Sequence, residues 1–237
     1  MPLVPAHRIR RAALRPVHRP RPVAPALVRP ATDVMHPEPT LQPAQISLHA
    51  PAWLAAWVNA HGDSYPDVAT RMRLCIELSA LNVEHETGGP FGAVVFDRAT
   101  FQLISAGVNR VESCSASIAH AEIMAITAAQ QQLGSFDLSA TGLPECELAT
   151  SCEPCAMCFG AIPWSGIRHL VCAAGDADAR RIGFDEGPKL SDWNKALMQR
   201  GISVATDVCR DEAVLVLQRY ATKNGLIYNG RADLKGD

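Results

Sequence analysis

Two short motifs, each at the expected start of a helix that follows a strand, constrain this chain more than any other feature. The first is His-x-Glu at 120–122 and the second is Pro-Cys-x-x-Cys at 154–158. Either motif alone is weak, because a lone His often caps a helix and a Cys pair can be redox-active or half of a structural zinc site. When strands alternate with helices, neighbouring helices point the same ends at one crevice. The two motifs are therefore expected to meet.

The hydrophobic pattern predicts such an alternation. Short apolar runs bounded by Gly, Pro or Asp indicate strands, and apolar residues at helical spacing indicate helices. Strands are expected at 91–96, 103–108, 146–150, 170–174 and 202–205, and helices at 49–60, 64–87, 119–132, 154–161, 176–182, 191–200 and 211–224. The order of these elements favours a layered α/β sandwich.

The residue types in the two motifs point to a catalytic metal. His120, Cys155 and Cys158 offer one nitrogen and two sulfur ligands, which suit Zn²⁺ and leave its fourth position for water. Zinc lowers the pKa of a bound water to about 7, and a carboxylate such as Glu122 can take up and deliver the proton. A structural zinc site has no use for that carboxylate. Cys152 is expected at a strand end and is left out of the ligand set, so the prediction is one zinc per chain.

Charge is unevenly distributed along the 237 residues, whose formal net charge is −2. Residues 1–45 hold ten Pro, seven Arg and two acids, a charge of +5 that leaves −7 for the remainder. This Pro/Arg-rich tail cannot bury enough surface to fold and is predicted to be disordered, with one domain over 46–237. An inert tail with Met35 as the true start, an organelle-targeting peptide and an RNA-binding arm are the three interpretations of it. The acidic remainder favours a small-molecule partner over nucleic acid.

The eight Cys and the hydropathy of the chain bear on its location. Clustered Cys without a secretory signal suggest metal binding in a reducing compartment. The apolar runs are too short to cross a bilayer. The sequence therefore predicts a cytoplasmic protein without a membrane partner.

Five stretches carry a resemblance to a known family. They are GGPFGAVV (88–95), GVNRV (107–111), AHAEIMAI (119–126), TSCEPCAMCFGAIPWSG (150–166) and IGFDEGP (182–188). The chain resembles the cytidine-deaminase-like superfamily of zinc enzymes and, within it, the guanine deaminase branch of bacterial nucleobase deaminases. The resemblance implies a three-layer α/β/α sandwich with a five-stranded mixed sheet. It also implies a homodimer, in which the C-terminal segment of some relatives crosses to the partner.

The resemblance assigns roles to five residues outside the zinc motif. Asn109 is expected to hydrogen-bond the base, and the alternative is that it serves only as a turn residue. Phe91 and Trp164 are expected against the substrate ring, with core packing as the alternative. Glu186 is expected to accept from N–H donors of the substrate and to transfer a proton, with a solvated loop carboxylate as the alternative. Tyr228 is expected to cover the pocket, unless it packs only on its own subunit.

The activity that the resemblance implies is hydrolysis of guanine to xanthine and ammonia, with Glu122 moving the proton. The triazine ammeline is a further expected substrate. A tRNA adenosine deaminase has the same zinc site and remains an alternative, as does a deaminase of guanosine or of a cytosine-type small molecule. Pocket shape decides between these rings, and the sequence does not give it.

Overall fold

The computed structural model describes residues 46–229. The predicted tail, Met35 and residues 230–237 lie outside this range. The helices are α1 (Ala52–Ala60), α2 (Val68–Glu84), α3 (Ala121–Leu133), α4 (Ala156–Ser165), α5 (Asp176–Arg181), α6 (Trp193–Met198) and α7 (Arg210–Thr222). The strands are β1 (Gly92–Asp97), β2 (Leu103–Val108), β3 (Cys146–Cys152), β4 (His169–Ala174) and β5 (Ser203–Ala205).

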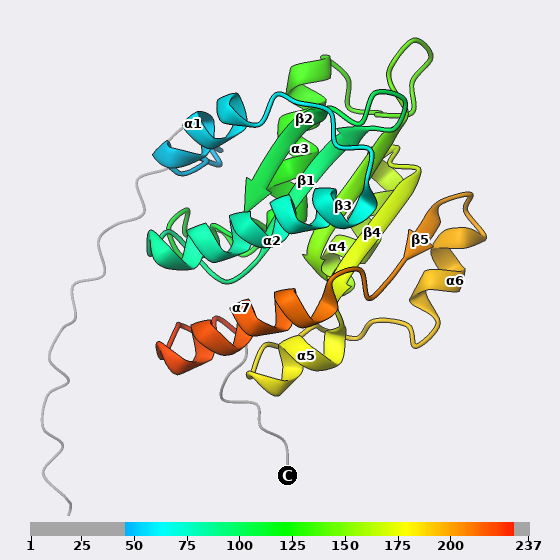
Figure 1. The fold of residues 1–237 in the computed structure, drawn as a ribbon. Coiled ribbons are helices and arrows are strands. Elements are labelled where there is room, and N and C mark those ends of the chain that lie inside the picture. The colour runs from blue at the N-terminus through cyan, green and yellow to red at the C-terminus, as the bar shows by residue number, and fades with distance from the viewer. Residues whose placement is uncertain (1–45, 230–237) are drawn as a thin grey trace, which may run out of the picture. The chain divides into compact units, whose positions relative to one another are not determined.

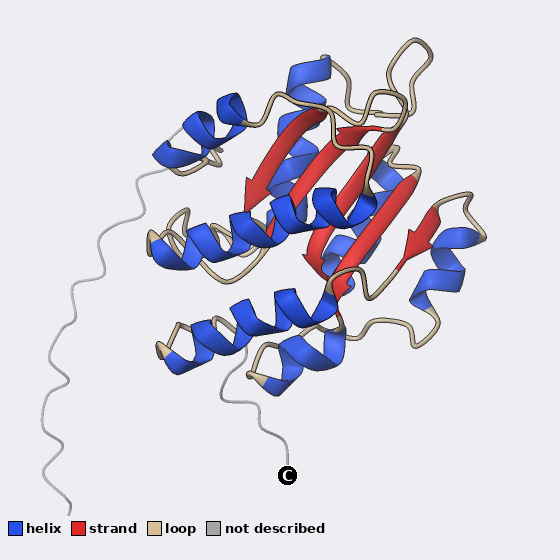
Figure 2. Ribbon diagram, viewed as in Figure 1, coloured by secondary structure: helices blue, strands red, loops and turns tan. Residues whose placement is uncertain are grey.

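The strands form one mixed sheet in the order β2-β1-β3-β4-β5 (Figure 2). β1 is antiparallel to both β2 and β3, whereas β3, β4 and β5 run parallel. The expected five-stranded mixed sheet is confirmed. β3 extends two residues beyond its predicted end, because Cys152 pairs with Ala174 and continues the parallel ladder.

Helices cover both faces of the sheet, α2 and α7 on one and α3 and α4 on the other (Figure 1). Successive residues of β1 point to opposite faces, as strand geometry requires. Val94 and Phe96 enter the core beneath α2 and α7, while Ala93 and Val95 enter the core beneath α3 and α4. Burial of the sheet on both sides explains why its strands read as continuous apolar runs.

Two further features concern the chemistry of the chain. All eight Cys lie within the described residues, and each is free. Among residues 46–229, no helix has the length and apolar character that crossing a bilayer requires.

Candidate active site

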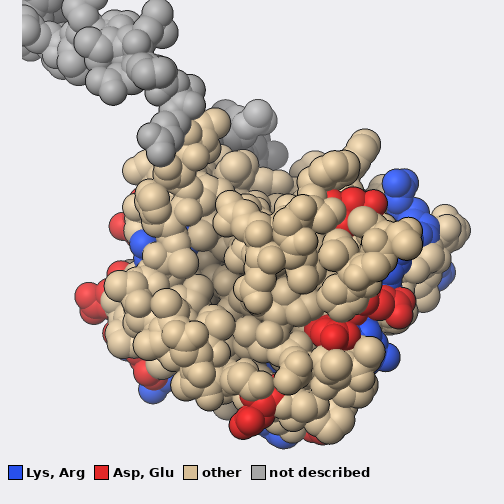
Figure 3. All heavy atoms as spheres, turned by 90° about the horizontal axis from the view of Figure 1, so that it is seen from above, with Lys and Arg blue, Asp and Glu red and all other residues tan. Residues whose placement is uncertain are grey.

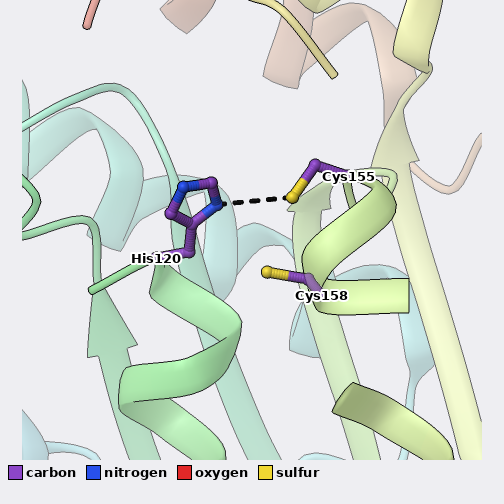
Figure 4. Close-up of side chains that lie close together, drawn as sticks. All are labelled: His120, Cys155 and Cys158. Atoms are coloured by element: carbon purple, nitrogen blue, oxygen red, sulfur yellow. Dashed lines mark hydrogen bonds between the residues drawn. The ribbon is translucent and has the colours of Figure 1, made fainter. Parts of the chain in front are cut away.

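The two sequence motifs meet at the amino ends of α3 and α4. His120 is the N-cap residue of α3 and Cys155 is the N-cap residue of α4, and neither side chain bonds to its own helix. Both side chains are therefore free to point into the crevice between the helices, where Cys158 joins them from the first turn of α4 (Figure 4). One ligand atom from each of the three lies within 4.8 Å of the others, and His120 Nδ1 is 3.5 Å from Cys155 Sγ.

The pKa values of these three groups depend on one another, and the types of donor atom suit a metal cation. The hydrogen bond from Cys158 and then that from His120 lower the pKa of the Cys155 thiol to about 4. The same bond to Cys155, together with burial, raises the pKa of Cys158. Burial alone lowers the pKa of His120, but the bond to Cys155 and the charge of Glu122 outweigh it and raise that pKa. A buried thiolate beside an imidazole and a second thiol is the donor set that Zn²⁺ prefers.

Glu122 lies in the first turn of α3, two residues after His120, and its side chain is buried. Among the described residues it forms no ion pair. Burial and the nearby Cys155 charge raise the pKa of Glu122 to about 7. A carboxyl group with this pKa can both accept and release a proton near neutral pH.

A cavity of about 220 Å³ opens beside this cluster, and a second acid lines it. Glu186 belongs to the segment that follows α5, and only 6% of the residue is exposed. Its backbone carbonyl accepts a hydrogen bond of 2.9 Å from the N–H of Ala156, the first residue of α4. Burial, followed by the charges of Cys155 and Glu122, raises the pKa of Glu186 to about 8. The cavity therefore holds two acids whose pKa values are raised to near neutral pH.

Asn109 lines the same cavity and is 1% exposed. Its Oδ1 accepts from the N–H of Val111 at 3.3 Å, while its Nδ2 has no hydrogen-bond partner among the described residues. The Gly-Gly pair at 88–89 explains how the Asn109 turn fits here. A Cβ on Gly88 would overlap the Asn109 carbonyl oxygen, and a Cβ on Gly89 would lie 2.8 Å from Tyr228 Oη. Gly88 is required because the Asn109 backbone approaches it closely, whereas a side chain at Gly89 would displace the Tyr228 hydroxyl group.

Three aromatic rings form the apolar wall of the cavity. Phe91 meets Phe184 edge-on with ring centroids 5.0 Å apart, and Tyr228 lies 5.1 Å from Phe184. The ring of Tyr228 also lies 6.5 Å from that of His120. The C-terminal segment thus places Tyr228 against the cavity of its own chain.

The structure does not bring Trp164 into this cavity. It lies at the far end of α4, is 84% exposed and lines a separate surface hollow. The reason is helix geometry, because nine residues beyond Cys155 correspond to roughly 13 Å along the helix axis. The sequence proximity of Trp164 to the Cys pair is therefore misleading.

Two residues that line the cavity are not predicted from the sequence. Phe184 was expected only as part of a matching stretch, yet it packs against both other aromatic rings. Asn229 follows Tyr228; its Oδ1 accepts from the Asp185 N–H at 2.9 Å and its Nδ2 donates to the Gly183 carbonyl at 2.8 Å. The one sequence signal for Phe184 is that an apolar residue stands between Gly183 and Gly187. No local signal connects residue 229 with residues 183–185.

Comparison with known proteins agrees with this geometry. The family model "Cytidine and deoxycytidylate deaminase zinc-binding region" matches residues 67–174, a range that includes the whole His/Cys/Cys cluster. The guanine deaminase of Bacillus subtilis is 36% identical over 133 residues, which are 56% of this chain and 81% of that protein. A solved structure of guanine deaminase from Nitrosomonas europaea superposes with a TM-score of 0.71 and 45% identity, covering 76% of this chain and 100% of that one. A solved complex with 2,6-diaminopurine superposes with a TM-score of 0.74 and 47% identity, covering 79% of this chain and 98% of that one.

Proposed function

Because the chain belongs to the cytidine-deaminase-like superfamily and to its guanine deaminase branch, we propose that it hydrolyses guanine to xanthine and ammonia. That it is a zinc-dependent hydrolytic deaminase of a cyclic amidine follows from the family. The substrate and the residue roles are the proposal. The observation that carries it is that Glu186 and the unpartnered Asn109 amide line the same cavity as Glu122 and the metal cluster.

The metal cluster and Glu122 account for the reaction type. His120, Cys155 and Cys158 hold the zinc, which when bound supplies the Lewis acid that lets water act as a nucleophile near neutral pH. Glu122 takes a proton from the attacking water. It then delivers protons to the ring nitrogen and to the departing amino group at C2. Water and guanine are consumed, and ammonia and xanthine leave.

The remaining residues account for the choice of base. Guanine presents O6 and N7 as acceptors and its 2-amino group as a donor. The free Nδ2 of Asn109 supplies a donor for an acceptor on the ring, and a buried unpaired donor favours a ligand that satisfies it. The carboxyl group of Glu186 accepts from the N–H groups at the amino edge and holds C2 near the metal. Phe91 and Phe184 provide the apolar surface for the ring, and Tyr228 covers it.

A tRNA substrate is the rival for this fold, and charge argues against it. An RNA enzyme needs a basic surface that holds phosphates around its pocket. Figure 3 shows the end of the molecule opposite the cavity, where Lys and Arg lie beside Asp and Glu and form no continuous basic surface. The chain beyond residue 45 is acidic as a whole.

Parallel assays of ammonia release test the substrate. Guanine, guanosine, ammeline, adenine, cytosine and cytidine are compared at equal enzyme, with an adenosine-containing tRNA anticodon stem as a further arm. We expect the highest kcat/KM for guanine, with weaker turnover of ammeline. A higher kcat/KM for any other base, or for the tRNA, would overturn the assignment.

We also propose a homodimer that covers the outer faces of α3 and α4. α4 contains no charged residue, and the only charged side chain of α3, Glu122, is buried. Met157 and Trp164 are nevertheless 36% and 84% exposed on α4. A helix that is apolar all round is normally buried, so a second copy is the natural cover. Exchange of the C-terminal segment between the two copies stays a prediction.

Light scattering tests the dimer. Twice the chain mass of 25.5 kDa is expected for the wild type, and the chain mass alone for Trp164→Asp. A wild type that is monomeric at assay concentrations contradicts the proposal.

A further inference from the structure

One buried lysine connects the segment that carries Glu186 to the turn that carries Cys155. Three Lys lie among the described residues, and only the side chain of Lys189 is buried, with 5% exposed. Lys195 and Lys223 are exposed. A buried ammonium group is strongly destabilising unless every donor has an acceptor. The burial of Lys189 therefore requires a structural explanation, whereas an exposed lysine would not.

The ammonium group of Lys189 has three oxygen partners, two through hydrogen bonds and one through an ion pair. Nζ lies 3.1 Å from the carbonyl oxygen of Pro154, 3.3 Å from Glu153 Oε2 and 3.3 Å from Asp176 Oδ1. It also lies 4.9 Å from the ring centroid of Trp193, a favourable cation–π distance. The three partners come from two elements, the turn before α4 and the start of α5. Lys189 thus bonds to the residue immediately before Cys155.

Two further hydrogen bonds hold the segment around Glu186 in place. The Glu186 carbonyl accepts from the N–H of Ala156 at 2.9 Å, immediately after Cys155. The Gly187 carbonyl accepts from Arg180 at 2.9 Å. The segment around Glu186 is therefore fixed on both sides of Cys155, through Ala156 on one side and through Lys189 on the other. A shift of this segment would move the Glu186 carboxyl group relative to the metal cluster.

We propose that Lys189 is a positioning residue whose ammonium group holds the Glu186 segment against the Cys155 turn and so sets the place of Glu186 beside the substrate. This inference rests on the proposed role of Glu186. Lys189 is not among the residues that line the cavity. Its proposed effect on catalysis passes through Glu186.

A double-mutant cycle tests this dependence. The variants are Lys189→Met, Glu186→Gln and the double variant, with exposed Lys195→Met as the matched control. They are assayed under single-turnover conditions on whichever base the wild type hydrolyses fastest. We expect Lys189→Met to lower kcat/KM by roughly 10- to 100-fold, because small misplacements of a reacting group have effects of that size. Zinc content stays at one per chain, and Lys195→Met behaves as wild type.

The Lys189→Met change in the Glu186→Gln background separates a positioning role from general structural damage. In the Glu186→Gln background, Lys189→Met should cause less than about a twofold further loss, because no carboxyl group remains to be positioned. Equal losses in both backgrounds, or wild-type kinetics for Lys189→Met, would overturn the inference. If Lys189→Met does not fold, Lys189→Arg goes through the same cycle. It keeps the charge but cannot place three donors in the same geometry.

The outcomes also separate this inference from the proposed function. If guanine is not hydrolysed but another base is, the substrate proposal fails while the cycle on that base still decides the role of Lys189. If Glu186→Gln has wild-type activity, the proposed role of Glu186 fails and the inference fails with it. If Glu186→Gln is impaired and the Lys189 effect is additive, only the inference fails.

Discussion

Asp178 and Glu186 are two buried acids on the same stretch of chain after β4, and their surroundings are opposite. Asp178 is 2% exposed and accepts from the Gly175 N–H, from Arg181 and twice from Arg210, at 2.8–3.0 Å. The Arg210 bonds are the main reason that its pKa falls to about 2. Glu186 is 6% exposed and has no ion pair among the described residues, and burial raises its pKa to about 8.

The difference separates structural acids from acids available for chemistry. Asp178 joins α5 to α7 and stays ionised, because four N–H donors, three of them from Arg side chains, bond to its carboxylate. Glu186, like Glu122, forms no ion pair among the described residues, and its pKa is raised to near neutral pH. Buried acids without partners are unfavourable for folding, so their presence in one cavity indicates function.

Replacement of Glu122 by Gln should have the largest effect, because it removes the group that moves the proton. We expect turnover to fall about 10³-fold or more with zinc retained at one per chain. Steady-state kinetics and metal analysis check this, with exposed Glu86→Gln as the control. Retained turnover would remove Glu122 from the reaction.

Replacement of Glu186 by Gln should come next. The Gln amide keeps the shape of the side chain but loses one acceptor oxygen and the exchangeable proton. We therefore expect turnover to fall about 10²-fold. Asp185→Asn is the matched control, because Asp185 is its exposed neighbour and also lines the cavity. Equal losses in the two variants would contradict the distinction between these two acids.

Replacement of Asp178 by Asn should have the smallest effect on activity and act on stability instead. The lowered pKa corresponds to about 2–3 kcal/mol of unfolding free energy at pH 7. This contribution is complete above the unfolded-state pKa of about 3.9 and disappears as pH falls through the folded-state value of about 2. Denaturant unfolding of both proteins should therefore show a difference at pH 7 that shrinks below pH 4. A constant difference would show that the ion pairs are not its source.

The sequence predicted those parts of the molecule that depend on local pattern. The strands and helices follow from apolar periodicity, and the meeting of His120 with Cys155 follows from two helices that begin at the same edge of the sheet. The distance of Trp164 from the cavity depends on how far α4 runs, which adjacency in sequence does not reveal. Lys189, Phe184 and Asn229 contact segments far along the chain, and no periodicity encodes such pairings. Glu186 was expected from resemblance, not from spacing.

The most direct test is to titrate zinc-depleted protein with Zn²⁺ and follow guanine hydrolysis. The account predicts no turnover without metal, a rise that levels off at about one zinc per chain, and equal amounts of xanthine and ammonia. Full guanine turnover by the zinc-free protein, or none by the fully loaded protein, would contradict it.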